Sequence, residues 1–208
     1  MKLRKILSAA LAVLLLLTLT ACGESVTYDQ SAYTPGTTVG YTYTCPRTGI
    51  AATLDENWLI YGPENFESVI GMEQDLSDRQ MVEDILNAGQ PIYELYAAHG
   101  DRSIVRVSVE DLRALYGDIT AQDYAEIQAN HLPNMAEAFS LEDPKVELGT
   151  TELAGSTYPS LHFTAQMVHV PHYEHHIYIQ RDNYLYTVTV ACVETDRCSE
   201  LLRLFTAA

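Results

Sequence analysis

Apolar and polar residues alternate along much of the last third of the chain. Four apolar residues there are separated by single residues: Leu161, Phe163, Ala165 and Met167. In a β-strand, such residues share one face of the sheet. Comparable segments predict strands at 145–149, 158–169, 173–181 and 184–192, with Asp182-Asn183 as a two-residue hairpin turn between the last two. The last third is therefore predicted to be an antiparallel four-strand meander.

Shorter strand patterns occur earlier in the chain. Residues 41–45 and 50–54 flank Pro46-Arg47-Thr48-Gly49, a sequence that suits a tight turn. A second pair of segments, 92–98 and 103–109, flanks Gly100-Asp101. These patterns predict two hairpins ahead of the meander, with a further apolar patch at 58–61.

Helical spacings separate these strands, and residues 63–70 predict a short helix. Ser77 and Gln80 resemble a capping box before a helix whose apolar stripe is Met81, Val82, Ile85 and Leu86. Thr120 and Asp123 begin a further helix, which Pro133 should kink or divide and whose expected inner stripe is Tyr124, Ile127, His131 and Met135. Thr195 is expected to cap a final helix that buries Cys198, Leu201, Leu202 and Phe205.

Strands in hairpins with helices kept apart from them indicate an α+β fold. This element order resembles that of the PsbP-like/DcrB-like group, and within it small clostridial-type lipoproteins. The matching marks are Asp55-Glu56-Asn57-Trp58 after the first hairpin and Tyr184-Leu185-Tyr186-Thr187-Val188-Thr189 before the last helix. The resemblance implies a central antiparallel sheet of about six strands flanked by helices, ending in a four-strand meander and a C-terminal helix. It supplies no catalytic residue.

The beginning of the chain has the layout of a secretory leader. Lys2, Arg4 and Lys5 precede an uncharged, largely apolar stretch that ends at Ala21. The following tetrapeptide, Leu19-Thr20-Ala21-Cys22, resembles the lipobox of bacterial lipoproteins. The resemblance implies that Cys22 is lipidated and that the leader is removed before it. Plain secretion would not explain the cysteine, and the apolar run is at the short end for a transmembrane helix.

Three segments follow from this interpretation: a signal peptide at 1–21, a lipidated cysteine with a flexible tether at 22–39, and a single α+β domain at 40–208. The tether is predicted because its residues are small and polar and lack apolar periodicity. The expected location is the extracytoplasmic face of the cell membrane.

The charge of the mature chain excludes one class of partner. All 28 acidic residues lie beyond residue 21, and of the 12 basic residues three lie in the leader. Such an acidic surface repels phosphate backbones, so we expect no nucleic-acid binding. It also repels anionic lipids, so membrane attachment must come from the lipid on Cys22. The expected partners are the membrane and an envelope protein or cell-wall component.

The remaining cysteines are Cys45, Cys192 and Cys198, which permit at most one internal disulfide in three possible pairings. Burial of the thiols is the alternative to a bridge. Neither the cysteines nor any other residues form a familiar catalytic motif, since G-x-S-x-G, P-loop and G-x-G-x-x-G sequences are absent from the chain. The sequence therefore favours a non-enzymatic binding domain that needs no cofactor.

A histidine-rich segment offers the alternative of metal binding. His169, His172 and His176 would converge if residues 170–172 formed a hairpin turn, with Glu174 as a further ligand. Imidazole nitrogen is a good ligand for zinc and other divalent transition metals. His175 would point to the opposite face of the strand from His176. The other interpretation of these residues is a polar, exposed hairpin.

Overall fold

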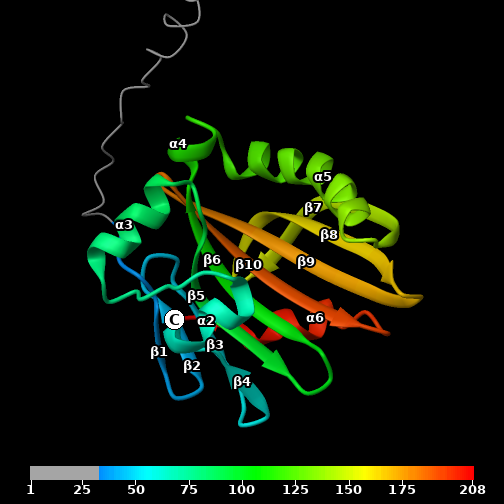
Figure 1. The fold of residues 1–208 in the computed structure, drawn as a ribbon, viewed down its shortest axis with the longest axis horizontal. Helices are drawn as coiled ribbons and strands as arrows, with labels where there is room; N and C mark the ends of the chain where they lie inside the picture. The colour runs from blue at the N-terminus through cyan, green and yellow to red at the C-terminus, as the bar shows by residue number, and fades with distance from the viewer. Residues whose placement is uncertain (1–32) are drawn as a thin grey trace, which may run out of the picture. The chain divides into compact units, whose positions relative to one another are not determined.

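The structure is a computed structural model that describes residues 33–208, an α+β domain built on two antiparallel sheets (Figure 1). The larger sheet has seven strands in the order β4-β5-β6-β10-β9-β8-β7. These are β4 (Trp58–Ile60), β5 (Ile92–His99), β6 (Ile104–Asp111), β7 (Glu142–Leu153), β8 (Ser156–Met167), β9 (Val170–Arg181) and β10 (Tyr184–Val193). The α+β class, the antiparallel sheet and the closing meander are thus confirmed, with one strand more than expected.

The smaller sheet has the order β1-β2-β3-β11. Its strands are β1 (Thr37–Val39), β2 (Thr42–Cys45), β3 (Ile50–Thr53) and β11 (Phe205–Ala207). The predicted hairpin supplies β2 and β3, and its turn closes with the Gly49 N–H donating to the Cys45 carbonyl over 2.9 Å. Gly49 has φ +72°, a conformation that glycine adopts without steric cost.

The prediction of a terminal helix is wrong in its extent. The helix α6 (Cys198–Leu201) and a 3-10 turn (Leu202–Leu204) are followed by β11, which pairs with β3. Thr195 does not cap α6; the Cys198 N–H instead donates to Asp196 Oδ1 over 3.0 Å. Phe205 is buried as expected, but as a strand residue.

Three further helices have lengths near those predicted: α2 (Pro63–Ile70), α3 (Arg79–Asn87) and α5 (Ala121–Ala138). A one-turn helix, α4 (Leu112–Leu115), was not predicted. Asp78, not Ser77, caps α3 by accepting from the N–H groups of Gln80 and Met81. The difference arises because Ser77 Oγ donates to Asp75 instead.

The helix α5 begins at the predicted capping pair. Thr120 N–H donates to Asp123 Oδ2 over 2.8 Å, and Asp123 N–H donates to Thr120 Oγ1 over 3.1 Å. The helix is not divided at Pro133. The predicted inner stripe is only partly correct, since Tyr124 is buried but His131 and Met135 are exposed. The buried face instead uses small side chains, which let the helix pack close to the sheet: Ala121, Ala125 and Ala136.

The two faces of the seven-stranded sheet are covered differently (Figure 1). One face packs against α3, α6 and the smaller sheet to form the main core, which includes Val105, Val107 and Val109 of β6. The other face packs against α5, where a smaller cluster includes Leu161, Phe163 and Ala165 of β8 as predicted. Adjacent residues of each strand therefore serve two different environments.

The folded domain begins earlier than the predicted boundary at residue 40. Tyr33 is buried and donates a hydrogen bond to Glu94, and β1 pairs with β2. The expectation of a tether up to residue 39 is therefore wrong for residues 33–39. The predicted leader and Cys22 lie outside the described residues. Within residues 33–208, no helix is both long and apolar enough to cross a membrane.

Candidate functional site

A cavity of about 450 Å³ lies between α5 and the seven-stranded sheet. The second half of α5 and the segment after it supply an apolar side, with Leu132, Met135, Phe139 and Leu141. The sheet supplies a polar floor, with Arg106, Glu110, Glu174, His176, Thr187 and Thr189. Both its size and this mixture of surfaces are typical of sites for small ligands.

The polar floor results from the alternation of side chains along the central strands. In β6, the valines at 105, 107 and 109 enter the main core, so Arg106, Ser108 and Glu110 face the cavity. Thr187 and Thr189 face it from the neighbouring strand β10. Because α5 covers only part of this face, these polar groups remain next to an open space rather than in a packed interior.

A row of ionisable side chains crosses this floor. On β9, the Glu174 carboxylate lies between two imidazoles, with Oε1 2.8 Å from His172 Nε2 and Oε2 3.0 Å from His176 Nε2. The guanidinium of Arg106 lies 3.9 Å from Glu174 Oε2. Thr189 Oγ1 lies 3.2 Å from His176 Nδ1 and so holds the orientation of that ring.

The charges of this row determine the state of Glu174. Burial alone would raise the pKa of Glu174, but the contacts of His172 and His176 and the charge of Arg106 hold it well below the usual value. Glu174 is therefore an anion at neutral pH. Nearby, burial raises the pKa of Glu110, which accepts a 2.5 Å hydrogen bond from the Tyr124 hydroxyl.

The structure separates the three histidines predicted as a metal site. Met167 pairs with Val170, so the hairpin turn consists of Val168 and His169 and not of residues 170–172. His169 lies in this turn, and its side chain is 81% exposed. Its Nδ1 atom lies 3.4 Å from Glu142 Oε2. His172 and His176 lie together on β9, on either side of Glu174. The prediction placed the turn too late because it did not account for the positive φ of Val168 and His169.

His175 points to the opposite face from His176, as expected for adjacent strand residues. Its Nε2 lies 2.9 Å from Thr151 Oγ1, and its ring centroid lies 5.5 Å from that of His162. Burial and the neighbouring His162 lower the pKa of His175 to about 4, so it is neutral at pH 7. This second histidine group belongs to the face that carries α6.

All three cysteines predicted to be buried or bridged are buried and free within residues 33–208. The sulfurs of Cys192 and Cys198 lie 3.9 Å apart. Among the described residues, one group of potential metal ligands has its donor atoms within 4.8 Å of one another: His162, Asp196 and Cys198. It shares no member with the predicted histidine triad.

Arg106 was not among the residues predicted for a site, although its sequence context contains a signal. In the segment Val105-Arg106-Val107-Ser108-Val109-Glu110, every second residue is polar. In a sheet covered on both faces, such a strand must present polar groups to a covered surface. Buried polar groups are costly, so a row of them on a covered face of the sheet indicates a polar cavity there.

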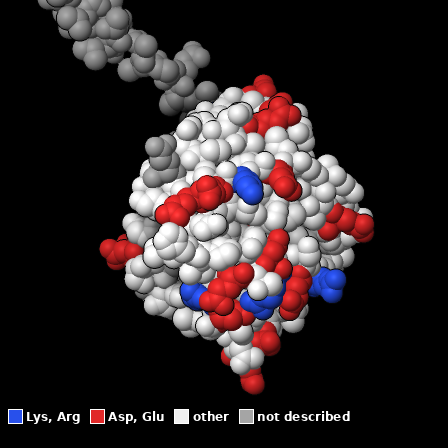
Figure 2. Space-filling model, turned by 90° about the vertical axis from the view of Figure 1, so that its right-hand side faces the viewer, with Lys and Arg blue, Asp and Glu red and all other residues white. Residues whose placement is uncertain are grey.

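Carboxylates are the more frequent charged groups of this chain, with 28 Asp and Glu against 12 Lys and Arg. On the face drawn in Figure 2, Asp and Glu side chains cover more of the surface than Lys and Arg do. This agrees with the formal net charge of −16 for the whole chain.

Comparisons with known proteins give similarities in structure only. No known protein family matches the sequence, and no curated protein does. Cyanobacterial PsbP (CyanoP) from Synechocystis sp. PCC 6803 is 12% identical, with a TM-score of 0.45, over 92% of this chain and 99% of that one. LpqN, involved in cell envelope biogenesis of Mycobacterium tuberculosis, is 9% identical, with a TM-score of 0.41, over 76% of this chain and 82% of that one.

A protein of unknown function from Pseudomonas aeruginosa is 19% identical, with a TM-score of 0.32, over 50% of this chain and 67% of that one. All three TM-scores lie below 0.5. These similarities therefore do not define a function for this chain.

Proposed function

We propose that this chain is a lipid-anchored, extracytoplasmic, non-enzymatic domain that binds a small amphipathic envelope component in the cavity beneath α5. The observation that supports the proposal most is the row of Arg106, Glu174 and His176 on the floor of a cavity whose other wall is apolar. Charged groups removed from water cost stability unless they are well paired, and an apolar replacement is often at least as stable. Their position beside an open cavity favours a role in recognition.

The two walls define the kind of ligand. Leu132, Met135 and Phe139 would contact an apolar body, and Phe139 is 72% exposed without one. Arg106 and His176 would contact a polar head group. Burial of Phe139 on binding would contribute about 1.5–3 kcal/mol.

The anchor part of the proposal rests on Cys22 and on the charge of the domain. A surface with this excess of carboxylates is repelled by anionic lipids, so two or more acyl chains would be needed for stable attachment. Replacement of Cys22 by alanine should abolish incorporation of labelled fatty acid and shift the protein from the membrane to the soluble fraction. Unchanged labelling of the Cys22→Ala chain would exclude this anchor, whereas Cys45→Ala is the matched control that should retain it.

Binding in the cavity can be tested with 1-anilinonaphthalene-8-sulfonate, a fluorescent amphipathic anion. The native chain should enhance its fluorescence, and Phe139→Ser and Arg106→Gln should each weaken binding by about tenfold, equivalent to about 1.4 kcal/mol. Val168→Ser is the control, because Val168 is 81% exposed on the β8–β9 turn and does not line the cavity. Equal binding by all four proteins would overturn the cavity as the site.

Metal binding by the histidine-rich hairpin remains a second proposal. His172 and His176 both contact Glu174, which supports a site at these two residues more than one that includes His169. His172→Gln and His176→Gln should then lower the affinity for Zn²⁺, measured by isothermal titration calorimetry, while His169→Gln should not. Equal affinity in all three variants would remove the hairpin as a metal site.

A further inference from the structure

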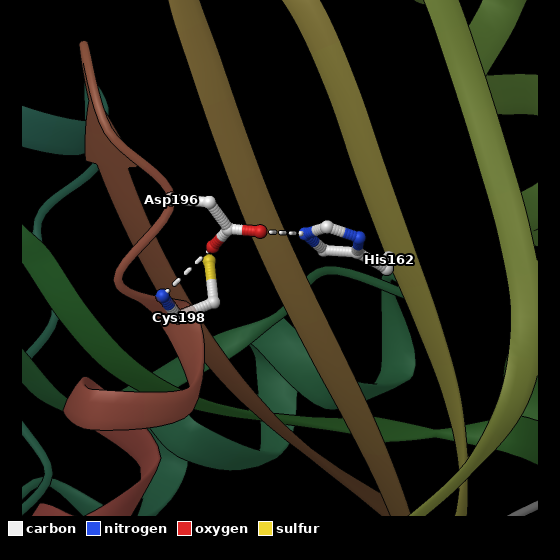
Figure 3. A group of neighbouring side chains, drawn as sticks. All are labelled: His162, Asp196 and Cys198. Atoms are coloured by element: carbon white, nitrogen blue, oxygen red, sulfur yellow. Dashed lines mark hydrogen bonds and ion pairs between the residues drawn. The ribbon is translucent and has the colours of Figure 1, made fainter.

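A group of three side chains with different donor atoms lies on the face of the sheet opposite to the cavity. His162 belongs to β8, Asp196 to the segment after β10, and Cys198 is the first residue of α6. Figure 3 shows the Asp196 carboxylate between the imidazole of His162 and Cys198. One nitrogen, one oxygen and one sulfur atom of these residues lie within 4.8 Å of one another.

Local structure holds two of these side chains in place. The Cys198 N–H donates to Asp196 Oδ1 over 3.0 Å, which fixes the carboxylate at the start of α6. The other oxygen, Oδ2, then lies 3.2 Å from His162 Nε2. The thiol of Cys198 is buried behind this pair, next to Cys192.

The His162 imidazole directs its buried Nε2 at the Asp196 carboxylate without forming a hydrogen bond to it. Its Nε2 is buried and has no hydrogen-bond partner among residues 33–208, because the 3.2 Å contact with Asp196 lacks hydrogen-bond geometry. A buried polar atom without a partner costs stability and calls for an explanation. A ligand that accepts the nitrogen lone pair would satisfy it.

We propose that His162 Nε2, Asp196 Oδ2 and Cys198 Sγ form a binding site for a divalent transition metal of the zinc class. Imidazole, carboxylate and thiolate are the three protein ligands that Zn²⁺ uses. Tetrahedral bonds of 2.0–2.3 Å place neighbouring donor atoms about 3.3–3.8 Å apart. The 3.2 Å separation of nitrogen and oxygen is close to that value, and the sulfur lies within 4.8 Å of both atoms.

The three residues would leave a fourth position on the ion for a water molecule. The side chains of His162 and Asp196 are 23% and 41% exposed, so the ion would have an entry path from this side. The sulfur of Cys192 lies 3.9 Å from that of Cys198 but outside the group of three atoms. A site with three protein ligands and one water is the arrangement that zinc adopts where a position is left for exchange.

Cobalt(II) reports directly on the sulfur ligand. The untagged full chain, kept reduced, should bind one Co²⁺ and show a thiolate-to-cobalt charge-transfer absorption that Zn²⁺ displaces. Cys198→Ser should abolish this absorption, and the matched substitution Cys192→Ser, at an equally buried position, should retain it. Absence of the band in the native chain, or its persistence in Cys198→Ser, would overturn the proposal.

Substitutions of the two partly exposed ligands, His162 and Asp196, test the site without disturbing the buried core. His162→Gln and Asp196→Asn should weaken Zn²⁺ binding by more than about 100-fold, since even residues that only orient a ligand change affinity 10- to 100-fold. Asparagine keeps an oxygen to accept from the Cys198 N–H, so α6 retains its start. His131→Gln, at an exposed position on α5 outside both candidate sites, is the control and should bind Zn²⁺ as the native chain does. Equal affinity in His162→Gln and the native chain would contradict the assignment.

Discussion

Two glutamates on opposite faces of the seven-stranded sheet, one buried and one partly exposed, show how one type of side chain can serve different purposes. Glu94 of β5 lies in the main core, where the Tyr33 hydroxyl donates to Oε1 over 3.0 Å and the Tyr43 hydroxyl to Oε2 over 2.5 Å. A β-bulge between Tyr93 and Leu95 disturbs the strand at this point. Such a bulge redirects a side chain from the pattern of its strand.

Glu174, in contrast, lies beside the cavity and contacts Arg106, His172 and His176. Burial raises the pKa of Glu94 because its neutral tyrosine partners offset only part of the cost of removing a charge from water. The cationic and imidazole partners of Glu174 lower its pKa instead. Glu94 therefore ties the segment 33–36 to the sheet, whereas Glu174 keeps a charge available to a ligand.

The largest expected difference between the two sites concerns stability. Glu94→Ala leaves two buried tyrosine hydroxyls without their acceptor, at about 1–3 kcal/mol each. We expect it to lower the free energy of unfolding by about 2–5 kcal/mol, and Glu174→Ala by less than half as much, since water in the cavity can reach the groups that it leaves. Urea denaturation of both variants measures this. Equal losses would mean that the comparison between the sites is wrong.

A smaller effect is expected where the chain approaches Glu94 most closely. A Cβ atom at Gly36 would lie 2.5 Å from a ring carbon of Tyr43 and 2.7 Å from Glu94 Oε2. Gly36→Ala should therefore lower the free energy of unfolding by about 1–3 kcal/mol, as overpacking does. Gly149→Ala is the matched control, since a Cβ there meets no atom within 4 Å. If thermal unfolding shows the same loss of stability for Gly36→Ala and Gly149→Ala, the close contacts at Gly36 do not contribute to that loss.

The pH dependence of stability should differ in sign between the two glutamates. The folded-state pKa of Glu94 is raised, so the native chain should lose stability relative to Glu94→Gln as the pH rises above about 4.3, by at most about 1.4 kcal/mol per pH unit. The folded-state pKa of Glu174 is lowered. Its contribution relative to Glu174→Gln should therefore be complete above about pH 4.3 and be lost as the pH falls below it.

Denaturation curves at a series of pH values, for the native chain and the two glutamine variants, measure both slopes. Slopes of the same sign would show that the partners of Glu94 and Glu174 do not have opposite effects on the charge.

Local sequence patterns predicted most of the individual elements. The alternation in β8 and the proline at the start of α2 act over a few residues, so their consequences could be read directly. The pairing of strands that are distant in the sequence could not be predicted from such local patterns. Nothing in residues 205–207 indicates that they pair with β3, and the competition between Ser77 and Asp78 for the cap of α3 depends on where Asp75 lies.

The candidate sites show the same division. The sequence drew attention to the histidines and to Glu174, but the position of one turn decided that His169 would lie apart from His172. Arg106 is close to Glu174 because their strands, β6 and β9, are both neighbours of β10 in the sheet, so the arginine side chain has only one strand to cross. His162 and Cys198 come together across a separation of 36 residues, which no local pattern encodes.

The pairing of β11 with β3 has a consequence for the order in which the parts of the domain fold during synthesis. The two strands are about 150 residues apart in sequence, and they complete a sheet whose other edge is β1. During synthesis, Ile50 and Ala52 therefore lack their final neighbours until residues 205–207 have been made. The smaller sheet should be the last part of the domain to form, and the first to open when a protease trims residues 205–207.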